Sequence, residues 1–562
     1  MKFYNKIIAI SLLVGTIGVS CKKLDSLIDN PNSVDPSQAN VDLLLNGVGQ
    51  NFTSIYNAFS DAGGQLTRQQ AMTGPLYNNA YTPTYFDGTW TSAYTGVIKN
   101  SNALIPLALQ QKKFVQAGIA QTLKAYTLGT LVDYFGDVPN SESALGQDNL
   151  NPKSDPGTAV YKNVFTLLDS AISNFSKTGG GSAPTNDIFY GGNTAKWKKA
   201  AKTLKLKFLM QSRLVDASVT AQIQTLITEN DLIVDAANDF TFKYSTVNSS
   251  PDSRHPHYGA NYNNASTGSN TANDYIGTYF MWVIGIEKSG TGSVTSLDPR
   301  RRFYFYRQNT NYANVNSSSC PCSEQSTPGH YTVDMPFCLI GAGYWGRDHG
   351  DATGVPPDNA FRTTWGVYPA AGEFDASQNT AVNNSRGGKG AGIDPIFMSS
   401  FTYFLQAEAA LKLGITSAGT PKSLLEKGVR ASIAKVLAFP TTVNVTVPAA
   451  NIPTTAAIDA YVTKVNDLYD AATTDAERLD VIIKEYYIAA WGNGIEPYNN
   501  YRRTGSPSNM QFTLLPTPGL FIRSFFYPSV YINRNFNAPT QKTPGTAANK
   551  VFWDNNPDNF IK

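Results

Sequence analysis

One segment of this chain reads Thr194-Ala-Lys-Trp-Lys-Lys-Ala-Ala-Lys-Thr-Leu-Lys-Leu-Lys-Phe-Leu-Met-Gln-Ser-Arg-Leu214. Its apolar side chains recur every three or four residues, which is the spacing of one helix face. The pattern predicts an amphipathic helix over 194–214 that packs against other helices, with its lysines in solvent on the opposite face. The apolar stripe consists of Trp197, Ala201, Leu204, Phe208 and Leu209.

Segments with the same periodicity lie before and after it. They predict helices at 41–59, 90–111, 115–134, 158–175, 222–230, 401–413, 422–437, 456–471 and 476–490. The helix at 115–134 is followed by Gly136, which tolerates a left-handed backbone, and by Pro139, which prevents continuation. Helices of roughly 15–20 residues joined by short links pack as antiparallel pairs, and such pairs can stack into a superhelix. The chain is therefore predicted to be mostly α-helical.

Helical periodicity is interrupted between residues 239 and 396, a stretch too long to be a bare loop in a compact domain. Short β-like runs occur in it at 240–244, 303–306 and 337–340, so we interpret it as an inserted, loop-rich domain. The predicted organisation is a signal peptide (1–20), a tether (21–40), a helical scaffold (41–238), the inserted domain (239–396), the continued scaffold (397–490) and an irregular cap (491–562).

The N-terminus has the features of an export signal. Lys2 and Lys6 precede an apolar run over 7–19, which is too short to span a bilayer. The run ends Gly18-Val-Ser-Cys21, and small residues before a cysteine are typical of a lipoprotein signal whose cleavage leaves Cys21 as the lipidated N-terminus. An ordinary secretory signal is the alternative. No other stretch is apolar enough to span a membrane, so we expect an anchored protein.

Export makes the remaining cysteines candidates for a disulfide. A bridge from Cys338 to Cys320 or Cys322 would close a loop of about 15 residues, worth roughly 3 kcal/mol by the chain-entropy estimate. The paired spacing of a zinc site is missing, and no metal or cofactor is predicted.

The composition favours a neutral polar ligand. The formal net charge is +3 and 15% of the residues are charged, which argues against a nucleic-acid binder. Aromatic residues make up 12% of the chain, many of them in segments rich in Asn, Thr, Ser and Gly.

Two motifs with cofactor or metal associations fail on their context. Gly341-x-Gly343-x-x-Gly346 matches a dinucleotide fingerprint, but no βαβ pattern surrounds it. His255-Pro-His257 beside Asp252 fits a surface turn better than a metal site.

Paired carboxylates are the alternative that would make this chain an enzyme, since a glycoside hydrolase needs only two. The best pairs in loops are Asp348 with Asp351 and Glu373 with Asp375. Loop acids beside Gly and Arg are usually turn formers or members of ion pairs. We therefore predict no catalytic residue.

Aromatic side chains in loops are the remaining candidates for ligand contact. The apolar faces of a sugar ring pack on aromatic planes, while a few polar groups bond its hydroxyls. Local packing is the alternative for each of these rings, and Trp197 and Trp491 are expected in the core. The candidates are Tyr77, Tyr81, Tyr85, Trp282, Tyr344, Trp345, Trp365 and Tyr368.

Several motifs together resemble the SusD/RagB-like nutrient-binding lipoproteins of the outer membrane, and among them the second SusD-like subfamily. Singly each is weak, but they span nearly the whole chain in order. They are Trp90-Thr-Ser-Ala-Tyr-Thr-Gly-Val-Ile-Lys-Asn-Ser-Asn102, Asp133-Tyr-Phe-Gly-Asp-Val-Pro139, 197–213, Asp298-Pro-Arg300, 343–375, Gln406-Ala-Glu408-Ala and Trp491-Gly-Asn-Gly-Ile-Glu-Pro-Tyr-Asn-Asn-Tyr-Arg-Arg503-Thr-Gly.

The resemblance implies a superhelix of about four tetratricopeptide-like helix pairs, with the insertion and the cap packed on one side. It implies a cell-surface protein that binds an oligosaccharide and delivers it to a TonB-dependent β-barrel transporter of the SusC type, acting as its lid. It implies no catalysis. A peptide ligand, as in the RagB branch, is the nearest alternative. The family's ligand contacts lie in variable loops, so none is carried over to this chain.

Overall fold

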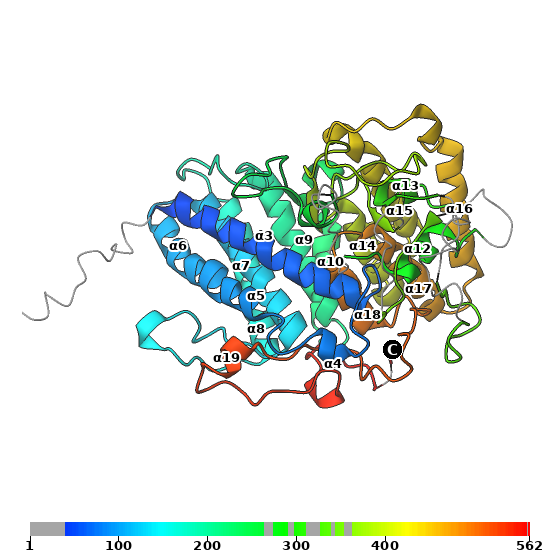
Figure 1. Ribbon diagram of the computed structural model, residues 1–562. Coiled ribbons are helices and arrows are strands. Elements are labelled where there is room, and N and C mark those ends of the chain that lie inside the picture. Colours follow the sequence, from blue (N-terminus) through cyan, green and yellow to red (C-terminus); the bar gives the residue numbers. More distant parts are fainter. Residues whose placement is uncertain are drawn as a thin grey trace, which may run out of the picture.

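The computed structural model describes residues 40–262, 274–289, 297–310, 326–338, 343–352, 362–558 and 560–561. Its main elements are helices, which confirms the mostly α prediction. In Figure 1 the N-terminal helices, blue to cyan, form one half of the molecule, and α14–α17, yellow to orange, form the other. The red C-terminal segment runs along one side of both.

The first half contains the segments predicted to be helical, but the first helix continues to Leu66, beyond its predicted end at 59, and the segment predicted as one helix at 90–111 is divided into three elements. Successive helices pack as pairs, notably α7 with α8 and α8 with α9. The elements are α3 (Val41–Leu66), α4 (Tyr77–Ala80), α5 (Asp87–Thr91), the π-helix η3 (Ser92–Ile98), α6 (Lys99–Gln110), α7 (Phe114–Phe135), α8 (Gly157–Phe175), α9 (Thr194–Ser212) and α10 (Val219–Glu229).

The second half contains α14 (Ser399–Leu413), α15 (Pro421–Thr442), α16 (Thr455–Ala471) and α17 (Asp475–Ala489). Helix α14 packs against α15, and α16 against α17. Local signals fix the helix starts: at α17, Thr474 and Glu477 form a capping box, in which each side chain bonds the other residue's backbone N–H. The cap is irregular apart from α18 (Ile495–Thr504) and the short α19 (Ser529–Ile532).

The inserted region is held at its two ends by a strand pair. Strand β1 (Phe240–Lys243) pairs antiparallel with β4 (Ile393–Phe397), so the chain leaves and re-enters the scaffold at one place. Between them lie α11 (Pro256–Tyr262), α12 (Thr278–Gly285), α13 (Arg301–Tyr304), β2 (Phe305–Arg307) and β3 (Thr363–Trp365), with β2 paired to β3. The β-like run predicted at 303–306 is therefore helical in its first half. Residues 339–340 of the run at 337–340 lie outside the described residues.

A buried carboxylate joins three segments that are far apart in the sequence. Glu408 on α14 lies 2.6 Å from Arg213 Nη2, just after α9, and 2.8 Å from Arg503 Nη2 on α18. Nearby, Lys207 of α9 is buried against Glu496, with an Nζ–Oε1 distance of 2.9 Å. The prediction that the lysines of α9 lie in solvent is thus wrong for Lys207, because α18 covers that part of the helix and supplies a carboxylate.

Within the described part of the chain, no helix has both the length and the apolar character needed to cross a membrane.

Candidate functional site

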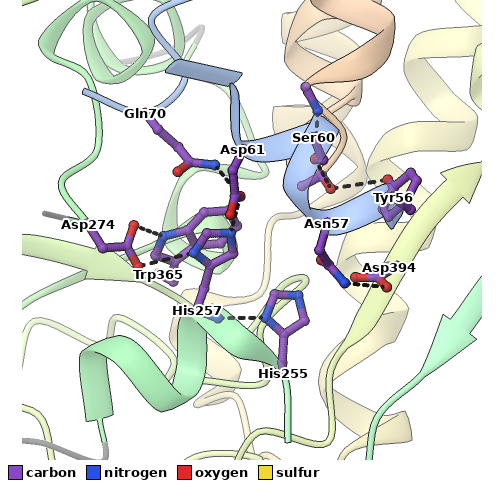
Figure 2. A network of polar contacts seen from close by, with 12 residues as sticks. Tyr56, Asn57, Ser60, Asp61, Gln70, His255, His257, Asp274, Trp365 and Asp394 are labelled. Atoms are coloured by element: carbon purple, nitrogen blue, oxygen red, sulfur yellow. Dashed lines mark hydrogen bonds and ion pairs between the residues drawn. The ribbon is translucent and has the colours of Figure 1, made fainter. Parts of the chain in front are cut away.

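A buried imidazole connects the inserted region to the scaffold (Figure 2). His257 on α11 has its Nε2 3.0 Å from Asp61 Oδ1 on α3, and its Nδ1 3.1 Å from Asp274 Oδ2. A neutral imidazole has one N–H donor, so carboxylates at both nitrogens require the doubly protonated cation. The inserted region is therefore attached to α3 through a charged side chain.

The surroundings of the two neighbouring histidines shift their pKa values in opposite directions. Burial alone would lower the pKa of His257, but Asp274 and Asp61 outweigh burial and raise that pKa to about 10. Burial, with the nearby His257 cation, holds the pKa of His255 well below its usual range. The pair is thus one cation and one neutral ring.

The expectation of a surface turn at His255-Pro-His257 is wrong, since His255 is 2% and His257 9% exposed. In the described ranges, no group of three or more His, Cys, Asp or Glu side chains is arranged to hold a metal ion.

Trp365 lies in a column of stacked rings beneath this histidine. Its ring centroid is 3.8 Å from that of His257 and 3.9 Å from that of Trp491, with interplanar angles of 9° and 20°. Trp491 stacks in turn on Phe280 at 4.9 Å. The indole Nε1 of Trp365 donates to Asp274 Oδ1 at 3.2 Å. Both faces of the Trp365 ring are therefore covered by protein.

Six of the eight aromatic side chains predicted as ligand contacts are buried, which favours local packing for them. The ring centroid of Tyr344, for example, lies 4.8 Å from Arg307 Cζ and 5.4 Å from Arg301 Cζ. Tyr85 is 39% exposed, and Trp282 is half-buried. The six are Tyr77, Tyr81, Tyr344, Trp345, Trp365 and Tyr368.

The acidic pairs considered for hydrolysis have structural partners. Asp348 accepts hydrogen bonds from Gln511 Nε2 at 2.6 Å and from the Cys338 backbone N–H at 3.0 Å, and burial raises its pKa to about 6. Glu373 pairs with Arg386, and Asp375 with Arg307, both at 2.6 Å. These contacts hold loops in place and leave no free acid–base pair among them.

Cys338 is disulfide-bonded. Cys320 and Cys322, its two predicted partners, and the lipidation residue Cys21 lie outside the described residues. The choice between the two partners therefore stays a prediction.

A groove of about 610 Å³ opens between the C-terminal segment and residues 326–338 of the inserted region. Aromatic side chains line it, and one of these is Tyr77, which the sequence predicted as a ligand contact. Threonine hydroxyls, Arg523 and Asp558 add polar groups. Apolar walls with a few polar groups are the usual make-up of a small-molecule site. The aromatic lining consists of Tyr77, His330, Phe512 and Phe521.

Local contacts fix the polar groups of this groove. His330 Nε2 lies 2.9 Å from the Thr513 carbonyl oxygen, which only accepts, so Nε2 carries a proton and donates. Arg523 is held by Asp554, with Nε 2.7 Å from Oδ2. The side chains are therefore set in place without a ligand.

A second cavity of about 800 Å³ lies beside α16 and α17. Its lining includes many charged side chains, among them Lys484, whose Nζ lies 2.6 Å from Glu287 Oε1. Because charged side chains outnumber the one aromatic residue, Phe560, in its described lining, the groove at Tyr77 is the better candidate site for a neutral polar ligand.

Sequence reasoning did not single out His330, Phe512 or Phe521. They are separated by up to about two hundred positions in the chain, and no spacing relates them. The only local signal is the turn-rich run Pro516-Thr-Pro-Gly519, which keeps the segment before Phe521 irregular.

Two family models match the chain in succession. One, described as starch-binding and associating with the outer membrane, matches residues 33–319. The other, described as SusD and RagB outer membrane lipoprotein, matches residues 376–529. No curated protein matches the chain.

Solved structures share the fold at low identity. A SusD/RagB family protein from Bacteroides thetaiotaomicron is 17% identical, with 92% of this chain and 100% of that chain covered and a TM-score of 0.63. A SusD homologue from Bacteroides fragilis is 18% identical, with 92% and 99% covered and a TM-score of 0.65. A chitin-binding SusD homologue from Flavobacterium johnsoniae is 18% identical, with 92% and 99% covered and a TM-score of 0.56.

The helical scaffold, the insertion and the family matches define a nutrient-binding protein of the outer membrane, a class whose members bind ligands rather than transform them. The chain belongs to the SusD/RagB-like family.

Proposed function

We propose that this protein is a cell-surface lipoprotein, anchored through Cys21, that binds a nutrient oligosaccharide and delivers it to a SusC-like TonB-dependent transporter as its lid. The observation that carries the ligand part is the groove of about 610 Å³ with its aromatic walls. The anchor follows from the cysteine after a short apolar signal, and from the lipoprotein description of the family.

The chemistry of the groove suits a carbohydrate. Phe512 and His330, which are half-buried, offer ring surface for the C–H faces of a sugar, and Thr513 and Thr546 offer hydroxyl groups that bond its hydroxyls. Among the described lining residues, the one Lys or Arg is Arg523, which is already paired with Asp554, so these residues do not select for a strongly charged ligand. Chitin-binding proteins among the structural neighbours also favour a glycan.

A peptide is the second candidate ligand, because the same groove could accept an extended chain with aromatic side chains. Hydrolysis is disfavoured, since the acids considered for it are held in structural contacts.

The ligand claim is tested by isothermal titration of the full-length chain in detergent against starch and chitin oligomers and against peptides of similar length. We expect saturable binding of a glycan. His330→Ala and Phe512→Ala should each weaken it about tenfold or more, which corresponds to ~1.4 kcal/mol or more. Phe536→Ser, an exposed aromatic outside the lining, is the control and should not change it.

If only the peptides bind, the ligand is a peptide, the second candidate, and the glycan proposal is wrong. A change in glycan chain length on incubation would make the protein a hydrolase and contradict the proposal. For the anchor, Cys21→Ser should release the chain from the membrane fraction, and continued membrane attachment would exclude lipidation at that residue.

A further inference from the structure

The C-terminal segment holds a phenylalanine in solvent. Phe536 is 94% exposed, and Leu150, in the loop beside it, is 72% exposed. A ring with nearly all of its surface in solvent is available for burial in a pocket of a partner.

The backbone around Phe536 is fixed by three hydrogen bonds to the loop that carries Leu150. The Phe536 N–H donates to Asn151 Oδ1 at 2.8 Å, and the Asn537 side chain donates to the Asn151 carbonyl at 2.6 Å. Asn535 Nδ2 donates to the Pro152 carbonyl at 2.7 Å. The ring is thus presented from a clamped turn, and its rotamer freedom is the main ordering cost left for binding.

This turn lies on the same face as the candidate groove. The C-terminal segment, whose residues 512–523 contribute to the groove lining, runs past α4 to α19 (Figure 1). On the way, Pro518 accepts a hydrogen bond from the Tyr77 N–H, and the Ser529 N–H donates to the Pro83 carbonyl, at 3.0 and 2.9 Å. Leu520 in the groove wall is 52% exposed and Tyr85 39%. Exposed apolar side chains therefore accompany the groove along this face.

The chemistry of the face fits a protein better than a lipid surface. Asn533, Arg534 and Asn537 beside Phe536 are exposed, so the apolar anchors stand in a polar surround. That is the make-up of a protein interface, in which a few buried aromatic anchors have a polar rim. A membrane-binding face needs a broad apolar surface, whereas the exposed apolar side chains here are few and stand among polar residues.

The tether limits where the partner can be. Residues 22–40 span at most about 65 Å when fully extended. With Cys21 in the lipid, the face can reach only partners at the outer membrane. A face that carries the ligand groove has to meet the protein that receives the ligand.

We propose that Phe536 and Leu150 form the anchor by which this face docks on the extracellular loops of its barrel transporter. The proposal rests on the proposed function for the identity of the partner. The partner should offer an apolar pocket for the Phe536 ring and polar groups for the surrounding asparagines.

The test is co-expression of the full-length chain with a SusC-like transporter of the same organism, followed by purification of the complex in detergent and measurement of its dissociation constant. Phe536→Ser and Leu150→Ser should each weaken the complex at least about tenfold, as expected for interface anchors. Leu43→Ser is the matched control, because Leu43 is 68% exposed but lies on α3. Glycan binding should be the same in all three variants.

A photoreactive benzoylphenylalanine at position 536 should cross-link to the transporter in intact cells, and one at position 43 should not. A complex that forms normally with Phe536→Ser would overturn the anchor while leaving the proposed function intact. Absence of any complex with the unaltered chain would overturn both the partner and the anchor, even if glycan binding persists. Binding to phosphatidylcholine–phosphatidylglycerol vesicles that is lost in Phe536→Ser, with the complex unchanged, would assign the anchor to lipid and contradict the proposal.

Discussion

Two clusters of buried ion pairs, which we call joints, connect segments that are far apart in the sequence, and the central charges of the two joints have opposite signs. In the scaffold, the Glu408 carboxylate lies between Arg213 and Arg503; at the inserted region, the His257 cation lies between Asp61 and Asp274. The scaffold joint is closed, with the Glu408 side chain 0% exposed, whereas the Asp61 end of the other joint is 36% exposed. Solvent weakens the charge pairs that it reaches. We therefore expect the inserted region to be held less firmly on the scaffold than the scaffold helices are on one another.

The difference also separates two uses of buried charge. The scaffold joint connects α14 to α18 and the end of α9, so it fixes the order in which helices pack. The His257 joint connects one helix of the scaffold to the inserted region, which contributes His330 to the groove. Binding regions are commonly drawn from the less stable parts of a fold, and the open joint is consistent with that.

The largest effect is expected at the closed joint. Glu408→Gln removes the charge that compensates two buried guanidinium groups, and breaking a buried pair in this way costs about 3–5 kcal/mol. Urea unfolding of the full-length chain should show this loss as a lower midpoint. A loss below about 1 kcal/mol would mean that water already reaches the joint, and the contrast between the two joints would then fail.

An intermediate effect is expected at the open joint. His257→Gln removes hydrogen bonds to two carboxylates, each of the charge-assisted kind, and we expect a loss of about 1.5–3 kcal/mol. The loss should be local: amide hydrogen exchange should accelerate in β3, whose Trp365 stacks on His257, before it accelerates in α7. Equal acceleration in both would show that the inserted region and the scaffold open as one unit.

The pH dependence should distinguish the joints by sign. The pKa of His257 is raised from 6.5 to about 10, so its contribution is fully present below pH 6.5 and is lost as the pH rises through about 10. The pKa of Glu408 is lowered from 4.5 to about 2 because Arg503 and Arg213 outweigh the effect of burial. Its contribution is present above pH 4.5 and is lost as the pH falls through about 2.

We therefore compare the unfolding midpoint of the unaltered chain with those of His257→Gln and Glu408→Gln across this pH range. The difference between the unaltered chain and each variant should disappear at opposite ends of the range. The unaltered chain should approach His257→Gln only at alkaline pH, and Glu408→Gln only at acidic pH. A constant difference from His257→Gln between pH 6 and 10 would show that the ring is not a cation in the folded state.

Much of the scaffold follows from helical periodicity, because burial of one face is a local pattern. The helix predicted at 115–134 is Phe114–Phe135 in the structure. The exception at 92–98 is a π-helix, in which Gly96 lies close against α3: a Cβ on Gly96 would lie 2.3 Å from Asn51 Cγ. Helix α18 was missed for a related reason. Its sequence Ile-Glu-Pro-Tyr-Asn-Asn-Tyr-Arg-Arg-Thr reads as polar loop, yet Glu496, Arg502 and Arg503 are buried with partners from other segments.

For the candidate site, the sequence predicted the type of residue but not which residues come together. Aromatic-rich loops indicate rings that will either pack or bind, but the choice depends on which segments cover them. Trp365 is covered because His257 and Trp491, from positions on either side of it, stack on its two faces. Tyr77 reaches the groove because the C-terminal segment passes beside it. Neither contact can be predicted from the spacing of residues in the sequence. This explains why, of the eight candidates predicted, one lines the groove.

The smallest effect is expected where the scaffold carries the same pair of residue types on its surface. Glu426 and Arg430 form an i,i+4 pair on α15 at 2.8 Å, with side chains 37% and 43% exposed. Glu426→Gln makes the same chemical change as Glu408→Gln, against the same kind of partner and in the same kind of helix. Because water and salt screen the exposed pair, the expected loss is about 0.5 kcal/mol or less, and raising the salt concentration should remove it. If the two variants lost similar stability, burial would not be what makes the Glu408 joint strong, and the number of arginines around each carboxylate would have to account for it.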